Sequence, residues 1–262
     1  MVVLPPGTLL QLMYLQERLR HIPPGKFIEI GPGNGEITGL LLENGWTGVS
    51  YDLDYCTVSG LKKRFEKEIS NQHFFAINSN FMASPPAKEK VDLVISCMVM
   101  EHLNEDEQRA YLQTATKSLK EDGMMIGLVP ASPEHWGIED DIAGHFRRYT
   151  KTSLESLAAH NNWRLLHIAG LTFPISNFLL PVSNYLVNKN ERSKLALSAL
   201  ERTKHSGRRQ VKFKTHFPSI LGLFLNKFAM YPLHIIQKFF SKSDRALVLY
   251  FEAKPCAEKN NQ

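Results

Sequence analysis

The sequence predicts an α/β fold: a mostly parallel sheet of seven strands, helices on both faces, and a helical insertion between the last two strands. Three observations support this prediction. Apolar runs of strand length, bounded by turn residues, recur seven times. Segments of helical periodicity separate the first five runs, an alternation typical of a parallel sheet covered on both faces. Residues 171–244 lack strand alternation and are interrupted by prolines.

The elements follow one another in a regular order. The predicted strands are 26–30, 48–51, 73–77, 91–96, 124–129, 163–169 and 246–251, and helical periodicity covers 36–43, 56–69 and 105–119. Asn104 precedes Glu107 by three residues, and Thr152 precedes Glu155 by three, so each pair predicts a capping box at a helix start. We expect residues 1–170 and 245–255 to form the core, with 171–244 inserted into it.

Composition narrows the class of protein. A chain of 262 residues with 43% hydrophobic content can bury a sizeable core. Cys56, Cys97 and Cys256 lack metal-ligand spacing, so we expect free thiols, no metal site and a reducing compartment. The first residues do not read as a secretory leader, so a cytoplasmic protein is expected. The net charge of +5 comes from residues 202–243, which include nine Lys or Arg and no acid, so nucleic-acid binding is not expected.

A glycine-rich loop follows the first predicted strand. Residues 31–35 read GPGNG, Glu29 lies two residues before them, and Asp52 ends the second predicted strand 17 residues after Gly35. Glycine has no Cβ, so the backbone of such a loop can approach a ligand closely. The spacing differs from the G-x-G-x-x-G fingerprint of dinucleotide-binding folds. The loop therefore suits either a pyrophosphate or a carboxylate-bearing nucleotide ligand, with a spacing that departs from the NAD version.

Several ordered motifs continue this pattern along the chain. HFFAINSNF, VDLVISCMVMEHL and LKEDGMMIGLVP follow in sequence order at the third, fourth and fifth predicted strands. Together with the glycine loop, they resemble the motifs of class I S-adenosylmethionine-dependent methyltransferases over roughly the first 170 residues. The resemblance implies a Rossmann-like sheet, S-adenosylmethionine as cofactor, and methyl transfer as the activity.

The resemblance also implies a cofactor site. Its expected residues are Glu29, Gly31, Gly33, Asn34, Gly35, Asp52, Leu53, Asn80, Phe81, Cys97 and Met98. Asp52 would accept hydrogen bonds from both ribose hydroxyls, and Glu29 would orient the amino group of the methionine portion. Asn80 would accept a hydrogen bond from the adenine amine, although a turn role is the alternative. Met98 would line the pocket or simply fill the core.

The segment after the fifth predicted strand is rich in polar groups. It reads ASPEHWGIEDDIAGHFRRYTKTSL, and its G-H-F-R-R-Y-T portion resembles small bacterial methyltransferases that act on sugars, lipids or secondary metabolites. We expect His145 to be the general base of an O-methylation, oriented by Asp141, with a structural loop histidine as the alternative. One of Arg147 and Arg148 would bind an anionic acceptor group, while the other would pair with Glu139 or Asp140.

The insertion is expected to cover the acceptor site. Ile220, Phe224 and Phe228 recur at four-residue steps, so we expect one apolar helical face there, ending at Pro232. The apolar run is too short to span a membrane. With the basic stretch 204–214 nearby, it favours an amphipathic or anionic small-molecule acceptor and allows peripheral membrane contact. Two other functions stay open: a non-catalytic nucleoside-binding subunit and an NAD-dependent oxidoreductase.

Overall fold

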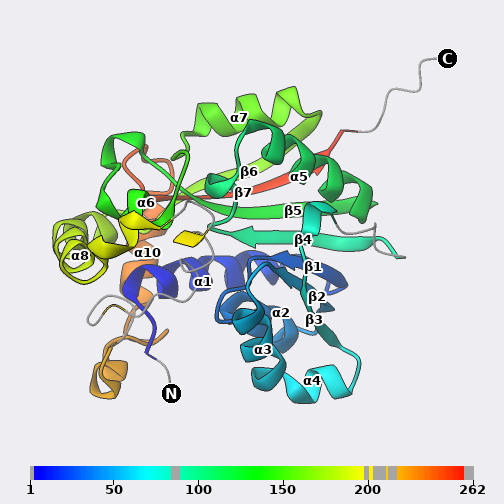
Figure 1. The fold of residues 1–262 in the computed structure, drawn as a ribbon, viewed down its shortest axis with the longest axis horizontal. Helices are drawn as coiled ribbons and strands as arrows, with labels where there is room; N and C mark the ends of the chain where they lie inside the picture. The colour runs from blue at the N-terminus through cyan, green and yellow to red at the C-terminus, as the bar shows by residue number, and fades with distance from the viewer. Residues whose placement is uncertain (1–2, 84–88, 198–200, 203–210, 212–216, 257–262) are drawn as a thin grey trace.

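A single sheet forms the centre of the molecule. The computed structural model describes residues 3–83, 89–197, 201–202, 211 and 217–256. The strands are β1 (Lys26–Ile30), β2 (Thr47–Asp52), β3 (Phe74–Asn78), β4 (Val91–Cys97), β5 (Leu119–Pro130), β6 (Trp163–Leu171) and β7 (Val248–Pro255), in the order β3-β2-β1-β4-β5-β7-β6 (Figure 1). Among these strands, β7 runs antiparallel to both of its neighbours, β5 and β6, and all other neighbouring pairs are parallel. The predicted Rossmann-like, mostly parallel sheet is confirmed.

Helices cover both faces of the sheet. They are α1 (Pro6–Leu19), α2 (Glu36–Glu43), α3 (Tyr55–Arg64), α4 (Glu66–Ser70), α5 (Glu105–Ser118), α6 (Ile138–Ala143), α7 (Lys151–His160), α8 (Ile175–Glu191) and α10 (Tyr231–Phe239). One apolar core joins α1, α2 and α3 to the sheet, and a second joins α5 and α7 to its other face (Figure 1). The two cores hold the strands in place in the sheet. The functional residues lie at the carboxyl ends of the parallel strands.

Helices α5 and α7 each begin directly after a residue whose backbone is extended and whose side chain caps the helix. Asn104 forms the predicted capping box with Glu107 at the start of α5. The second predicted box is wrong. Thr150 is the last extended residue before α7, and its side chain accepts a hydrogen bond from the backbone N–H of Ser153 at 3.0 Å. Thr152 already lies inside the helix, so it cannot cap it.

The expected continuous helix within the insertion is also wrong. A short 3₁₀ helix, η5 (Ser219–Leu223), is followed by turns, because the side-chain oxygen of Asn226 accepts hydrogen bonds from the backbone N–H groups of Phe228 and Ala229. Phe224 and Phe228 are 69% and 93% exposed, so they form no buried helical face. The basic stretch 204–214 lies outside the described residues except for Val211. Within the described part of the chain, no helix is long and apolar enough to cross a membrane.

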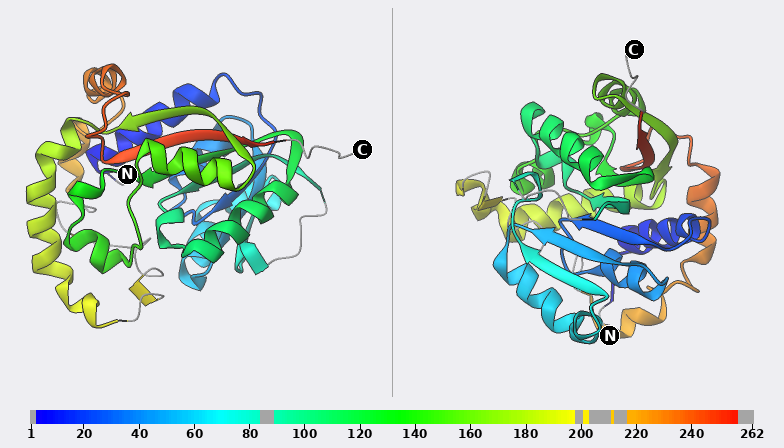
Figure 2. Two further views of the ribbon diagram at one scale, coloured as in Figure 1. Left: turned by 90° about the horizontal axis from the view of Figure 1, so that it is seen from above. Right: turned by 90° about the vertical axis from the view of Figure 1, so that its right-hand side faces the viewer.

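Helices α8 and α10 of the insertion both contact α1 but extend over different parts of the protein. Helix α10 packs on α1: Glu17 bonds His234 and Lys238, and Gln237 donates to the carbonyl of Leu10. Helix α8 packs on α6 and crosses the ends of the parallel strands, as the left view of Figure 2 shows. The insertion therefore contributes one helix to the body of the protein and one to the edge of the sheet where the parallel strands end.

Candidate active site

A cavity of about 1270 Å³ opens at the carboxyl ends of the parallel strands. The loop after β1, the ends of β2 and β4, the segment from α6 to α7, and helix α8 all contribute to its wall. Ligands of open α/β sheets bind at this edge, where the strand order reverses. Ten of the eleven predicted cofactor residues line the cavity: Glu29, Gly31, Gly33, Asn34, Asp52, Leu53, Asn80, Phe81, Cys97 and Met98.

The glycine loop presents backbone to this cavity. Gly31 has φ +66°, and a Cβ built there would lie 2.6 Å from Cγ2 of Val99. Gly35 differs from its neighbours in the loop, because it faces away from the cavity. A Cβ on Gly35 would lie 2.6 Å from Cδ2 of Leu61 and 2.7 Å from the ring of Phe65. Gly35 is therefore needed for the packing of α2 on α3, and its expected place in the cofactor site is not supported by this geometry.

Glu29 is buried beneath the loop. Its Oε2 atom accepts hydrogen bonds from the hydroxyls of Thr38 at 2.5 Å and Ser50 at 2.8 Å. Burial raises the pKa of Glu29 to about 7, although the two hydroxyls act in the opposite direction. The carboxyl group is thus held in one orientation against the cavity, where it could meet a cationic amine.

Asp52 ends β2 and is partly exposed to the cavity. Its Oδ1 atom accepts a hydrogen bond from the backbone N–H of Asp54 at 2.8 Å. Asp54 in turn caps α3 by accepting from the backbone N–H and the hydroxyl of Thr57, each at 2.8 Å. The turn between strand and helix therefore fixes the Asp52 carboxylate in place, and its binding of ribose stays a prediction.

Asn80 and Phe81 close the adenine side of the expected site. The Oδ1 atom of Asn80 accepts from the backbone N–H of Met82 at 3.0 Å, which is the turn role left open by the sequence. Phe81 is buried between the rings of Tyr51 and Tyr111, with centroids 5.7 and 5.9 Å away. A bond from Asn80 to adenine stays a prediction, because the side-chain oxygen already has one partner.

The end of β4 carries backbone strain. Met98 adopts φ +55°, a left-handed conformation that non-glycine residues seldom adopt. Its N–H still donates to the carbonyl of Leu128 at 2.8 Å, so the strained residue is anchored to β5. Burial raises the pKa of the neighbouring Cys97 to about 12, so its thiol stays protonated at neutral pH. Met98 lines the cavity and is more than core filling.

A buried pair of side chains lies beside the expected acceptor site. The Nδ1 atom of His145 lies 2.8 Å from Oδ1 of Asp140. Arg148 donates two hydrogen bonds to the same carboxylate, through Nε at 2.8 Å and Nη2 at 2.9 Å. Burial alone would raise the pKa of Asp140, but the bonds from His145 and Arg148 lower it to about 2. Asp140 is therefore ionised and holds the His145 ring in place.

The expected role of Asp141 is wrong. Its Oδ1 atom accepts a hydrogen bond from Nε1 of Trp136 at 2.9 Å, and the residue is exposed. Asp140 and Asp141 are consecutive in helix α6, so their side chains point about 100° apart around the helix axis. Only Asp140 faces inward to the residues that follow the helix.

The two arginines have separate environments. Arg148 forms the expected structural pair with Asp140, so that part of the prediction is confirmed. Arg147 donates to Oε1 of Gln108 and to the carbonyl of Leu103, each at 3.3 Å, and it does not line the cavity. Tyr149 is buried and donates a hydrogen bond to the carbonyl of Met100, so it packs in the core. An anion-binding role for Arg147 stays a prediction.

Glu101 and His102 are functional candidates that the sequence reasoning missed. They follow β4 in η2 (Met100–His102), and they line the cavity beside His145. Burial raises the pKa of Glu101 to about 8, and burial lowers the pKa of His102 to about 3. Their signal in the sequence was an adjacent acid and histidine a few residues after a buried strand, within VDLVISCMVMEHL.

The comparisons with known proteins agree with this geometry. The sequence matches a family model described as "Methyltransferase domain" over residues 10–168. TehB from Haemophilus influenzae has 17% identity and a TM-score of 0.50, over 60% of this chain and 52% of that chain. The glycopeptide N-methyltransferase MtfA, complexed with S-adenosylmethionine, has 12% identity and a TM-score of 0.50, over 61% and 79% of the two chains.

A third solved structure is the methyltransferase domain of bacterial CtHen1. It has 16% identity and a TM-score of 0.52, over 65% of this chain and 93% of that chain. At these identities the structures show the shared fold. Among curated proteins, none matches the sequence. This chain spans about half the length of the TehB chain.

Proposed function

Because the chain belongs to the methyltransferase-domain family, we propose that it transfers a methyl group from S-adenosylmethionine to a small-molecule acceptor. The observation that carries the proposal is one shared cavity. The glycine loop and Asp52 line one part of it, and His145 lines another, so donor and acceptor can meet there. Holding two reactants in line supplies much of the rate enhancement of a displacement reaction.

The donor side of the cavity suits the groups of S-adenosylmethionine. The backbone of Gly31 and Gly33 lets the methionine portion approach closely, and Glu29 lies beneath it with one oxygen held by two hydroxyls. Asp52 supplies a carboxylate for the ribose hydroxyls. Phe81 provides an apolar wall for adenine. The methyl donor is therefore S-adenosylmethionine, and S-adenosylhomocysteine is the product that leaves.

The acceptor side suits methylation of a hydroxyl oxygen. An oxygen lone pair attacks the methyl carbon, the carbon–sulfur bond breaks, and the hydroxyl proton must be removed. His145 is placed to take that proton through Nε2, because Asp140 holds Nδ1 on the other side of the ring. This arrangement supports the Asp140–His145 pair as the general base. Asp140 then has the orienting role that the sequence predicted for Asp141.

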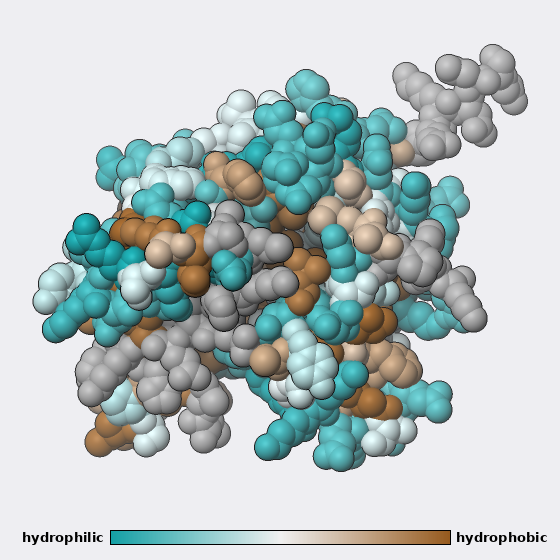
Figure 3. Space-filling model, in the orientation of Figure 1, coloured by the Kyte–Doolittle hydropathy of each residue, from teal (hydrophilic) through white to brown (hydrophobic). Residues whose placement is uncertain are grey.

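The insertion contributes an apolar part of the cavity wall. Leu179, Val182 and Leu186 from α8, with Phe224 and Leu225 from the insertion, line the cavity. Apolar surface is visible in Figure 3 on the side where Figure 1 places α6 and α8. Such a wall favours an acceptor with an apolar part, such as a lipid-linked sugar or a secondary metabolite. The insertion then acts as the cover of the acceptor site, and exposed apolar side chains of α8 allow contact with a membrane surface.

Transfer of a labelled methyl group tests the proposal. The purified protein is incubated with methyl-labelled S-adenosylmethionine and a fractionated bacterial extract, and label is followed into small molecules. Incorporation that requires the intact protein supports a methyltransferase. S-adenosylmethionine binding without transfer would favour a non-catalytic nucleoside-binding subunit, and binding of NAD in its place would favour an oxidoreductase.

The same proposal includes a cytoplasmic location, supported by the free thiols of Cys56, Cys97 and Cys256.

A further inference from the structure

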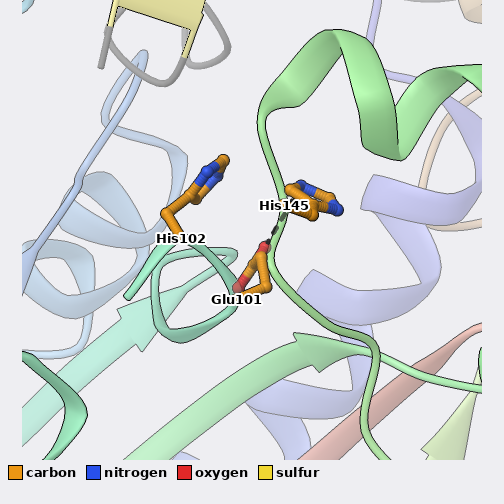
Figure 4. A group of neighbouring side chains, drawn as sticks. All are labelled: Glu101, His102 and His145. Carbon is orange, nitrogen blue, oxygen red and sulfur yellow. Dashed lines mark ion pairs between the residues drawn. The ribbon is translucent and has the colours of Figure 1, made fainter. Parts of the chain in front are cut away.

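We infer that Glu101, His102 and His145 bind a divalent transition-metal cation in the wall of this cavity. Each residue offers one ligand atom, and these atoms all lie within 4.8 Å of one another. Figure 4 shows the Glu101 carboxylate pointing toward the ring of His145, with His102 following it on the same short helix. All three residues line the cavity, so an ion held by them would face the bound reactants.

The carboxylate of Glu101 is the strongest evidence for a ligand. The residue is 0% exposed, and no described residue donates a hydrogen bond to either carboxylate oxygen. The Nε2 atom of His145 lies 3.8 Å from Oε1, which is beyond hydrogen-bond distance. Burying a carboxyl group that has no hydrogen-bond partner among the described residues destabilises the protein, and a bound cation would offset that cost by pairing with the ionised carboxylate.

His145 is oriented as a metal ligand would be. Asp140 lies 2.8 Å from Nδ1, so this nitrogen carries the proton and Nε2 presents its lone pair toward Glu101. Metal-binding histidines usually donate their second ring N–H to a carboxylate in this way, which fixes the ring and raises its basicity. Asp140 is itself fixed by Arg148 and by the backbone N–H of Gly137 at 2.9 Å.

The chain reversal after α6 brings the second histidine close. Gly144 ends α6 with φ +77°, and the backbone N–H of Phe146 then donates to the carbonyl of Glu101 at 2.8 Å. This bond joins the loop that carries His145 to the segment that carries Glu101 and His102. The planes of the two imidazole rings are inclined by 78°, with centroids 4.8 Å apart. One nitrogen of each ring lies within 4.8 Å of the other and of a Glu101 oxygen.

The donor set selects the kind of cation. Two imidazoles and one carboxylate suit Zn²⁺, Co²⁺ or Mn²⁺, whereas Ca²⁺ and Mg²⁺ favour all-oxygen sites. Ligand bonds of about 2.0–2.2 Å at tetrahedral angles put two ligand atoms of one ion about 3.3–3.6 Å apart. The present separations of up to 4.8 Å therefore require the side chains to move closer together by about an ångström. Three protein ligands leave positions open for water or an acceptor oxygen.

A cation here changes the part played by His145 in the proposed methyl transfer, on which this step rests. Nε2 can hold a proton or the cation, but not both. In the metal-bound protein, an acceptor hydroxyl bound to the cation would have a lowered pKa, and its proton would pass to water. His145 would then be a ligand, and the cation would replace it as the group that activates the hydroxyl. In the metal-free protein His145 remains the base.

Cobalt binding tests the site without the reaction. The full chain, without an affinity tag and after treatment with a chelator, is titrated with Co²⁺ by calorimetry and visible absorption. One bound Co²⁺ per chain is expected, with absorption bands typical of nitrogen and oxygen ligands. Glu101→Gln and His145→Asn should each weaken binding by more than the about 10–100-fold that loss of an outer partner costs. Thermal unfolding checks that each variant is folded, and His102→Asn provides a third ligand variant.

His135→Asn is the matched control, because His135 lies in the same segment but bonds Asn177 outside the cavity. It should bind Co²⁺ as the wild type does. No binding by the folded wild type, or unchanged affinity in all folded ligand variants, would overturn the metal site. S-adenosylmethionine binding is measured separately on the same samples. Cobalt binding without S-adenosylmethionine binding would support the cation site and contradict the proposed function. S-adenosylmethionine binding without cobalt binding would support the proposed function and contradict the cation site.

Discussion

His145 Nδ1 lies 2.8 Å from Oδ1 of Asp140, a carboxylate that the fold buries completely. Helix α6 ends at Gly144, whose positive φ turns the chain back over the helix. The backbone N–H of His145 consequently donates to the carbonyl of Asp140 at 3.0 Å, and the ring meets the side chain of the same residue. The position along the helix decides which acid pairs with His145. Asp140 faces inward, whereas the next residue, Asp141, points to solvent.

Stability should separate these two neighbouring acids. Asp140→Asn leaves the buried guanidinium of Arg148 without its counter-charge, so we expect a loss of about 3–5 kcal/mol in the free energy of unfolding. Asp141→Asn removes an exposed carboxylate and should change it by less than about 0.5 kcal/mol. Urea denaturation of both variants checks this. Equal effects would mean that Asp140 is not the partner of Arg148 in solution.

Loss of the His145 imidazole should affect turnover more than cofactor binding. We expect His145→Ala to lower kcat by about 10²–10⁴-fold, whether the imidazole acts as base or as metal ligand. The dissociation constant for S-adenosylmethionine should change little, because the glycine loop and Asp52 are untouched. Steady-state kinetics and calorimetry measure the two quantities. Full activity in this variant would return His145 to a structural role.

The burial of Glu29 predicts a pH dependence of stability in the ligand-free protein. Its pKa is about 7 when folded, against 4.5 for the free group. Between these values the folded state keeps a proton that the unfolded state releases, so the free energy of unfolding falls as pH rises. The fall should total about 3 kcal/mol from pH 4.5 to 8, relative to Glu29→Gln. Denaturation of both proteins across this pH range checks the prediction. If the free energy of unfolding depends on pH in the same way in both, folding does not raise the pKa of Glu29.

Two exposed phenylalanines of the insertion should differ in function. Phe224 lines the cavity, and Phe228 does not. If the insertion contacts the acceptor, Phe224→Ser should lower kcat/KM by about 10–150-fold, the effect of losing about 1.5–3 kcal/mol of apolar contact. Phe228→Ser is the matched control and should act as the wild type does. Undiminished turnover in both folded variants would show that this part of the insertion does not cover the acceptor.

The fold was predictable because its signals are local. Apolar runs and helical periodicity report burial along each element, and the capping box at Asn104 depends on residues three apart. The errors arise where a neighbouring residue competes for the same role. Thr150 caps α7 in place of Thr152, and Asn226 turns the chain where helical spacing predicted one continuous helix.

The candidate site was predictable only in part. The cofactor residues lie in motifs, so their positions along the strands place most of them on one cavity. Glu101 and His145 are about 40 residues apart in the sequence. The chain between them runs through β5, and its reversal at Gly144 brings the two residues together. Among the described residues no group donates a hydrogen bond to the Glu101 carboxylate, and this is a property of three-dimensional packing that no spacing in the sequence encodes.

The central claim is that this cavity binds S-adenosylmethionine through Asp52 and the glycine loop. Calorimetric titration of S-adenosylmethionine into the wild type and Asp52→Ala tests it most directly. We predict one bound molecule per wild-type chain, and a loss of about 1.5–3 kcal/mol of binding free energy in the variant, the scale of hydrogen bonds to a charged group. Equal affinity of the two proteins, or no binding to the folded wild type, would contradict the claim.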